Sequence, residues 1–323
     1  MAAPAAALTA SRVDLLDVID AGIPEREWVP GSPIFQRGRR YLFPGAAGSC
    51  KSLAELVQAV DMVAAGATVA IIDVENGGDE YARRLADVLA DRPAEVREAV
   101  AERLRYYAWP SLSLEWSADE WAAALAGCDL VIFDSSRLVL SSVGLAEDKA
   151  DDYAHFVAKL ILPLTRAGIT TAILDNTGWG GDHARGSSAK RDLCEVEYAV
   201  KRNGRVYLEN TGEVEFSLAR SRFPEQSPRL VMEIGGGTYG PLTEAPGDAD
   251  DRPPTRVKFL QDRLVAIIAE RGPLSQSDAL RAAGEPPNSG TGRRALRDAT
   301  GQGLLVRIDG LYSLSDGGVS HDG

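Results

Sequence analysis

The sequence predicts an α/β protein with a mainly parallel sheet, antiparallel strands on the C-terminal side of that sheet, and a small second domain. Three observations lead to this fold class. Apolar runs alternate with helical segments between residues 40 and 174, as expected when helices connect parallel strands. After residue 191 short strand-like segments follow one another. An acidic, proline-rich stretch then separates a last, mostly helical segment.

The parallel part of the sheet is predicted from continuous apolar runs. The runs ATVAIIDV, DLVIFD and ITTAIL are typical of strands that helices cover on both faces. Expected strands in this part are 40–43, 67–74, 104–109, 129–134 and 169–174. Expected helices are 52–65, 79–90, 117–126 and 150–167. The antiparallel strands are expected at 196–201, 205–210, 214–218 and 230–234, with an Asn203-Gly204 turn among them.

Composition sets the domain organisation. The chain has 323 residues, enough for one large and one small domain. The stretch TEAPGDADDRPP has the composition of a linker. We therefore expect five parts: an N-terminal extension, a large core, a linker, a small domain and a disordered tail. Their bounds are 1–27, 28–242, 243–254, 255–315 and 316–323.

Composition also limits the function and the location. No run of eighteen apolar residues exists, and the alanine-rich start does not resemble a signal peptide, so we expect a cytoplasmic protein without membrane contact. Three scattered cysteines argue against a disulfide framework and a structural zinc site. The net charge of −12 argues against a surface coated for nucleic acid, although residues 255–315 hold nine basic and six acidic residues.

A glycine-containing segment between an expected strand and an expected helix predicts a phosphate site. The segment GAAGSCKS is one residue short of the P-loop pattern G-x-x-x-x-G-K-[ST]. Backbone N–H groups of such a loop surround a polyphosphate, a lysine bridges the β- and γ-phosphates, and a serine hydroxyl binds Mg²⁺. The alternative is a glycine-rich turn with an incidental Lys-Ser. The expected ATP-binding residues are Gly45, Ala46, Ala47, Gly48, Ser49, Cys50, Lys51 and Ser52.

Two carboxylates follow expected strands. Asp134 ends LVIFD, the Walker B position in which a carboxylate holds Mg²⁺ together with Ser52. Apolar strands also end in aspartate for solubility alone. Glu75 directly follows IIDV, where a carboxylate can orient or deprotonate the attacking water. Its alternative is a solvated turn, because an Asn-Gly-Gly sequence follows it.

A loop after the third apolar strand carries a candidate arginine finger. Arg185 in HARGSSAK could reach the γ-phosphate bound to a neighbouring subunit. The alternative is a surface arginine, and Lys190 and Arg191 compete for the same role. If this loop binds DNA instead, Lys190 would contact a phosphate.

These segments together resemble the RepA-like AAA-family ATPases of bacterial plasmids, phages and integrated elements, which have a RecA-like P-loop NTPase core. The resemblance spans residues 28–236 in register and rests on the P-loop helix, DVENG, LVIFDSSRL, DKADDYA, ILPLTRAGITTAILDNTG and RGSSAKRD. It implies an ATPase that hydrolyses ATP with Mg²⁺, with Glu75 as the catalytic glutamate and Asp134 as the Walker B aspartate. It also implies self-association into a ring, a hexamer by analogy, with single-stranded DNA bound by the core.

The sequence departs from this family at two positions. Asn176 stands where the group usually has a histidine, and its amide can still sense a γ-phosphate by hydrogen bonding. Cys50 replaces the last glycine of the P-loop pattern, so slow or lost hydrolysis is conceivable. Two other functions therefore stay open: a nucleotide-gated DNA-binding or partner-recruiting module, and a recombination or repair ATPase.

The small domain has the element order of a winged helix. Helices are expected at 256–269, 275–283 and 288–299, followed by a hairpin in LLVRIDGLYSL. The third helix carries Arg293, Arg294 and Arg297 and would be the recognition element for duplex DNA. The alternative is a small helical interaction domain with solvated arginines.

Overall fold

The structure is a computed structural model of the chain. It describes residues 12–23, 25–177, 189–204, 211–245, 256–301, 303–308 and 310–315. The chain divides into two compact units, Met1–Ala245 and Pro246–Gly323. Each unit has its own sheet among the described residues.

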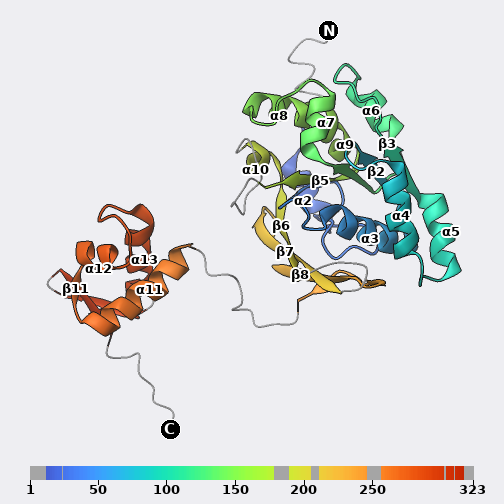
Figure 1. Ribbon diagram of the computed structural model, residues 1–323. Helices are drawn as coiled ribbons and strands as arrows, with labels where there is room; N and C mark the ends of the chain where they lie inside the picture. The colour runs from blue at the N-terminus through green and yellow to red at the C-terminus, as the bar shows by residue number, and fades with distance from the viewer. Residues whose placement is uncertain are drawn as a thin grey trace. The chain divides into compact units, whose positions relative to one another are not determined.

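The first unit is built on one twisted sheet (Figure 1). Its described strands are β1 (Arg40–Gly45), β2 (Val69–Asp73), β3 (Leu104–Ala108), β4 (Leu130–Asp134), β5 (Thr170–Asn176), β6 (Val196–Asn203), β7 (Gly212–Ser221), β8 (Arg229–Gly235), β9 (Thr238–Tyr239) and β10 (Thr243–Glu244). The strand order is β10-β8-β7-β6-β1-β5-β4-β2-β3, with β9 paired to β8. All pairs from β3 to β6 are parallel, and all pairs from β6 to β10 are antiparallel. The expected fold class is confirmed.

One strand direction was predicted incompletely. We expected β6 among the antiparallel strands, but it pairs in parallel with β1 and in antiparallel fashion only with β7. The physical reason is that the chain leaves β5 and passes through a further helix before it returns as β6, which is a crossover connection. The strand expected at 205–210 lies outside the described residues.

Helices cover both faces of the parallel sheet (Figure 1). The described helices of this unit are α2 (Leu15–Asp20), which has no buried residue, α3 (Lys51–Ala64), α4 (Gly78–Val88), α5 (Ala94–Arg103), α6 (Ala118–Ala124), α7 (Ser136–Ser142), α8 (Ala150–Phe156), the π-helical segment η1 (Val157–Ile161), α9 (Leu162–Arg166) and α10 (Ala189–Leu193). The helix expected at 150–167 is thus divided, because the π-helical segment and Pro163 interrupt its regular hydrogen bonding. A capping box of Ser117 and Glu120 begins α6.

The strand β1 shows how the two hydrophobic cores form. Its side chains alternate, so Tyr41 and Phe43 pack with α3, α4 and α5, while Leu42 packs with the helices from α6 to α9. All three side chains are fully buried. The sheet is therefore sandwiched between two helical layers, and its edges at the strand ends remain available for loops.

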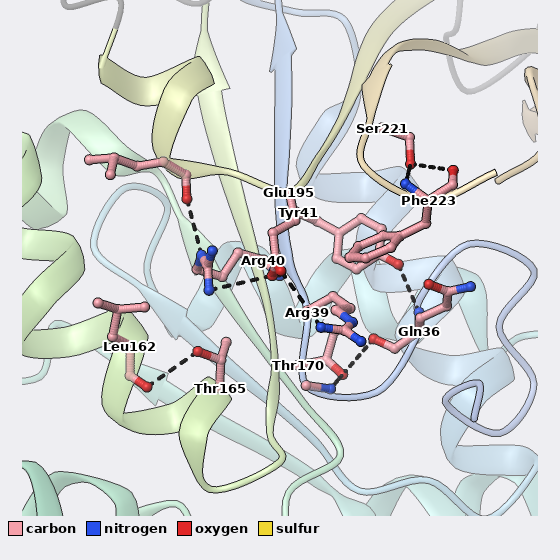
Figure 2. Close-up of polar contacts among 12 residues, drawn as sticks. Gln36, Arg39, Arg40, Tyr41, Leu162, Thr165, Thr170, Glu195, Ser221 and Phe223 are labelled. Atoms are coloured by element: carbon pink, nitrogen blue, oxygen red, sulfur yellow. Dashed lines mark hydrogen bonds and ion pairs between the residues drawn. The ribbon is translucent and has the colours of Figure 1, made fainter. Parts of the chain in front are cut away.

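A polar network fixes the amino end of β1 (Figure 2). The hydroxyl of Tyr41 accepts a hydrogen bond from the Gln36 amide at 2.8 Å, and Gln226 donates another at 3.0 Å. Glu195, just before β6, accepts from the Arg40 amide at 3.1 Å and forms ion pairs with Arg39 and Arg40. These contacts hold β1 against β6 at one end, so the loop at the other end of β1 starts from a fixed position.

The second unit is small. It contains α11 (Arg256–Arg271), β11 (Leu274–Ser275), α12 (Gln276–Ala282), α13 (Gly290–Gly301), β12 (Leu305–Ile308) and β13 (Leu311–Leu314). Its three strands form an antiparallel sheet in the order β11-β13-β12. Leu264, Leu280, Leu296 and Tyr312 form part of one buried cluster. The assignment of this unit as a winged helix stays a prediction. In the described parts of both units, no helix has the length and apolar character needed to cross a bilayer.

Candidate active site

Three polar loops meet at one edge of the parallel sheet. The register places the end of β1 beside the end of β5, with Gly45 opposite Asn176. It also places the end of β2 beside the end of β4, with Asp73 opposite Asp134. Because parallel strands all end at the same edge, the sheet gathers the predicted loop, the predicted metal ligand and Glu75 there.

The loop after β1 has the backbone of an anion cradle. Gly48 and Cys50 both have positive φ angles, +75° and +64°, and α3 begins directly after Cys50. No side chain caps the first turn of α3, so its N–H groups remain available to an anion. A Cβ at Gly45 would lie 2.6 Å from the Val200 carbonyl oxygen and 2.8 Å from Ser49 Oγ. Only glycine fits at the start of this loop.

The side chain of Lys51 lies folded over this loop. Its Nζ donates to the carbonyl oxygens of Gly45 at 2.8 Å and Ala46 at 3.1 Å, and to Asn176 Oδ1 at 3.1 Å. Burial lowers the pKa of Lys51, and the nearby charges of Asp134 and Glu75 oppose that shift. The ammonium is thus held by neutral oxygens beside the cradle, where an incoming phosphate would be a stronger partner.

The carboxylate of Asp134 is buried at the end of β4. Its Oδ2 accepts hydrogen bonds from the Tyr81 hydroxyl at 2.7 Å and from Asn76 Nδ2 at 3.1 Å. Burial, together with the charges of Glu75 and Asp73, raises its pKa to about 6 although hydrogen bonds from Ser52 and Tyr81 lower it. Because burial destabilises the charged form of this carboxylate, a bound cation would stabilise that form strongly.

The side chain of Glu75 is exposed, unlike that of Asp134. It lies two residues after the end of β2, and its Oε2 accepts a hydrogen bond from the hydroxyl of Ser135, the residue after Asp134. The carboxylate is therefore anchored next to the buried aspartate while water still reaches it. This is the combination that a general base or a water-orienting group requires.

The donor set fits Mg²⁺ and a polyphosphate together. Among the described residues, no group of three or more His, Cys, Asp and Glu side chains could hold a metal by itself. Mg²⁺ takes few protein ligands when substrate phosphates complete its shell. One carboxylate at Asp134, the hydroxyl of Ser52 and a phosphate cradle meet that requirement.

A cavity adjoins the loop on the side away from Asp134. It has a volume of about 320 Å³ and is lined by the loop residues 44–49, by Thr177 and by the end of β6 at 199–203. It lies beside β6, whereas Asp134 and Glu75 lie beyond β5 on the other side of β1. Along this edge of the sheet, the loop after β1 therefore lies between the acidic residues Asp134 and Glu75 on one side and the cavity on the other.

Comparison with known proteins adds the family. A family model described as an AAA domain matches residues 3–182. The chain belongs to the AAA domain family. This family assignment identifies the chain as a P-loop ATPase, as the loop geometry suggests. The matched part of the AAA domain contains Lys51, Glu75 and Asp134 and ends shortly after Asn176.

Comparison with curated proteins gives no match for this AAA domain protein. Among solved structures, a KaiC-like protein from the hyperthermophilic archaeon Pyrococcus horikoshii OT3 is similar at 13% identity with a TM-score of 0.47. The similarity covers 67% of this chain and 98% of that protein.

The structure brings together most of the residues expected in the site of this AAA domain. The whole loop from Gly45 to Ser52, Glu75, Asp134 and Asn176 lie at one sheet edge. Arg185 lies outside the described residues. The roles of these residues remain predictions that need biochemical tests.

The expectation for Lys190 was wrong. We expected Lys190 either to compete with Arg185 for the arginine-finger role or to contact a DNA phosphate. Both roles require an exposed ammonium group. Its side chain is instead fully buried, and its Nζ forms ion pairs at 2.9 Å with both Asp175 and Glu147. An ammonium held by two carboxylates in the interior cannot reach a second molecule.

Three residues of the site were missed from the sequence. Asp73 ends β2, Tyr81 lies on α4 and Tyr106 lies on β3, and each contacts a carboxylate or an amide of the site. Asp73 lies at the end of an apolar run, and this is the same pattern that predicted Asp134 as a site residue. The two tyrosines gave no such signal, because aromatic residues on helices and strands are usually core residues.

Proposed function

We propose that this protein binds Mg-ATP and hydrolyses it to ADP and phosphate. The observation that supports this proposal is the convergence of three strand ends: the cradle after β1, Asp134 at the end of β4 and Glu75 after β2. Each supplies a different part of phosphoryl transfer to water, namely anion binding, metal binding and placement of the nucleophile.

In this proposal each group has one task. The backbone of residues 45–50 and the N-terminus of α3 bind the phosphates, and Lys51 exchanges its carbonyl partners for phosphate oxygens. Ser52 and Asp134 hold Mg²⁺, which neutralises charge that develops on the phosphate oxygens. Glu75 orients the attacking water and accepts its proton. Asn176, which already contacts Lys51 Nζ, donates to the γ-phosphate through its amide nitrogen.

The nucleoside then takes the cavity beside β6. The terminal phosphate faces Asp134 and Glu75, so the other end of ATP extends over the loop toward residues 199–203. The volume of about 320 Å³ suits a nucleoside.

We propose further that ATP hydrolysis acts on DNA, in a RepA-like helicase or another replication ATPase of a plasmid, phage or integrated element. The order of the resembling motifs supports this role. In the second unit, Arg293, Arg294 and Arg297 all project as exposed side chains from α13, as a recognition helix requires. A ring, a hexamer by analogy, would place Arg185 of one subunit near the γ-phosphate bound to its neighbour.

The assay that tests this function is ATP turnover by the purified full-length protein, with and without single-stranded DNA. We expect Mg²⁺-dependent turnover that single-stranded DNA increases, and a particle several times the mass of one chain. Lys51→Ala should remove turnover. Turnover that persists unchanged in Lys51→Ala would exclude the site described here.

A nucleotide-gated DNA-binding module without hydrolysis is the second candidate. Two observations favour it: Cys50 occupies a positive-φ position that glycine usually fills, and Asn176 lacks a titratable group. It predicts ATP binding without turnover, with DNA affinity that changes when ATP is added. A recombination or repair ATPase would keep turnover but pair strands rather than unwind them.

A further inference from the structure

The turn that carries Glu75 is wrapped around a buried carboxylate. Asp73 Oδ1 accepts hydrogen bonds from the backbone amides of Glu75 and Asn76, both at 2.9 Å. Its Oδ2 accepts from the amide of Gly77 at 2.7 Å and from the hydroxyl of Tyr106 at 2.6 Å. The side chain is fully buried. Three successive backbone amides are therefore fixed by one side chain.

The same turn is tied to the metal ligand. Asn76 Nδ2 donates to Asp134 Oδ2 at 3.1 Å and lies 3.4 Å from Asp73 Oδ1, so the amide bridges the two carboxylates. Tyr81 donates to Asp134 in the way that Tyr106 donates to Asp73, and the two tyrosine rings are in contact, with centroids 4.9 Å apart. The turn that carries Glu75 is thus bonded to Asp73 and, through Asn76, to Asp134.

We propose that Asp73 is a positioning residue for hydrolysis: its carboxylate holds the 75–77 turn so that Glu75 faces the reacting phosphate. This inference rests on the proposed ATPase function. Asp73 touches neither the cradle nor Lys51 in any described contact, so its hydrogen bonds act on the reacting groups through the turn that carries Glu75 and Asn76.

The ionised form of Asp73 is essential to this role. Burial alone would raise its pKa, but the hydrogen bonds from Tyr106 and from the three amides outweigh burial and lower the pKa below its usual value. A carboxylate can accept all of these bonds because it has two acceptor oxygens. An asparagine at position 73 would turn an NH₂ group toward at least one N–H donor, and the turn would have to move.

The test compares Asp73→Asn with wild type in the full-length protein by steady-state ATP hydrolysis and by binding of a fluorescent ATP analogue. We expect kcat to fall about 10- to 100-fold, because a small displacement of a water-orienting group has an effect of that size. The KM and the analogue affinity should change less than about three-fold, because the cradle is untouched. Asp79→Asn, an exposed carboxylate in the first turn of α4, is the matched control and should retain wild-type kcat.

Two additional variants separate positioning from general stability. Tyr106→Phe removes one donor to Asp73 and should lower kcat less than Asp73→Asn, and it remains informative if Asp73→Asn does not fold. In a Glu75→Gln background, Asp73→Asn should cause no further loss, because the residue through which it acts is already disabled.

The outcomes are distinguishable. If wild type has no turnover, the proposed function fails and this inference fails with it. If wild type turns over ATP and Glu75→Gln abolishes turnover, but Asp73→Asn and Tyr106→Phe keep kcat within two-fold of wild type, this inference alone is overturned. A loss of analogue affinity that parallels the loss of kcat would also overturn it, since that pattern describes a structural residue.

Discussion

At the scale of single residues, Cys50 shows how the chain tolerates a departure from the usual phosphate loop. Its φ of +64° is a conformation that costs a side-chain-bearing residue of the order of 1 kcal/mol. The thiol is half-buried, with Sγ 3.9 Å from the Gly48 carbonyl oxygen. The side chain therefore follows the loop, which leaves the loop amides accessible.

We expect Cys50 to be alkylated selectively and to be protected by nucleotide. Cys128 and Cys194 are only 6% and 4% exposed, so they serve as internal controls. A saturating concentration of Mg-ATP should slow iodoacetamide labelling of Cys50 at least about ten-fold, because a bound ligand covers the loop. Mass spectrometry of the labelled peptide measures the rate. Lys51→Ala should lose this protection, and equal rates with and without Mg-ATP in wild type would contradict the loop assignment.

Asp134 predicts a pH dependence of stability. Its pKa is about 6 in the folded protein, above the usual aspartate value, because burial disfavours the charged form. The folded state therefore keeps the proton longer than the unfolded state, and the free energy of unfolding of nucleotide-free protein should fall as pH rises from about 4 to 6.

Urea unfolding across pH 4–7 measures this effect, with Asp134→Asn as the comparison. The variant should show a smaller decline over the same range, because residue 134 no longer titrates. In wild type, protons and Mg²⁺ compete for the carboxylate, so Mg²⁺ affinity should weaken below about pH 6. Identical pH profiles for wild type and Asp134→Asn would exclude the raised pKa.

At the scale of elements, the site residues that could be predicted from the sequence are those that lie at or just after the end of a strand. Apolar runs that end in a polar residue located Asp134 and the turn of Glu75, and the loop motif located α3. The contacts of Asp73 and Asp134 with Tyr106 and Tyr81 could not be predicted, because they depend on which strands and helices become neighbours. The burial of Lys190 was missed for the same reason, since Asp175 and Glu147 come from distant segments.

Because β6 lies close to the loop after β1, we expect Gly45 to be sensitive to substitution by a larger residue. Gly45→Ala would place a Cβ 2.6 Å from the Val200 carbonyl oxygen, so the backbone at Val200 or at residue 45 would have to shift. We expect a loss of stability of about 1–3 kcal/mol in chemical denaturation, together with weaker ATP binding. Gly240→Ala is the matched control, because a Cβ there meets its nearest neighbour at 3.6 Å. Equal effects of the two substitutions would contradict the close contact.

At the scale of the whole molecule, the fold class follows from the order of strands and helices along the chain, whereas the order of the strands in the sheet was not predicted. The alternation of apolar runs and helices predicted a parallel sheet, and the sheet is parallel from β3 to β6. The parallel pairing of β6 with β1 was missed because an apolar run does not indicate whether its strand is parallel or antiparallel to its neighbours in the sheet. The division of the 150–167 helix was missed although Pro163, inside the apolar pattern, signals an interruption of the helix.

The central claim is that one sheet edge binds the triphosphate of ATP with Mg²⁺. Isothermal titration calorimetry of ATP into the full-length protein, with and without Mg²⁺, tests this claim most directly. We expect Mg²⁺-dependent binding to wild type and an affinity about 10- to 100-fold lower for Lys51→Ala, which loses a charge-assisted contact. Binding of equal affinity to wild type and to Lys51→Ala, or no binding to wild type, would contradict the account.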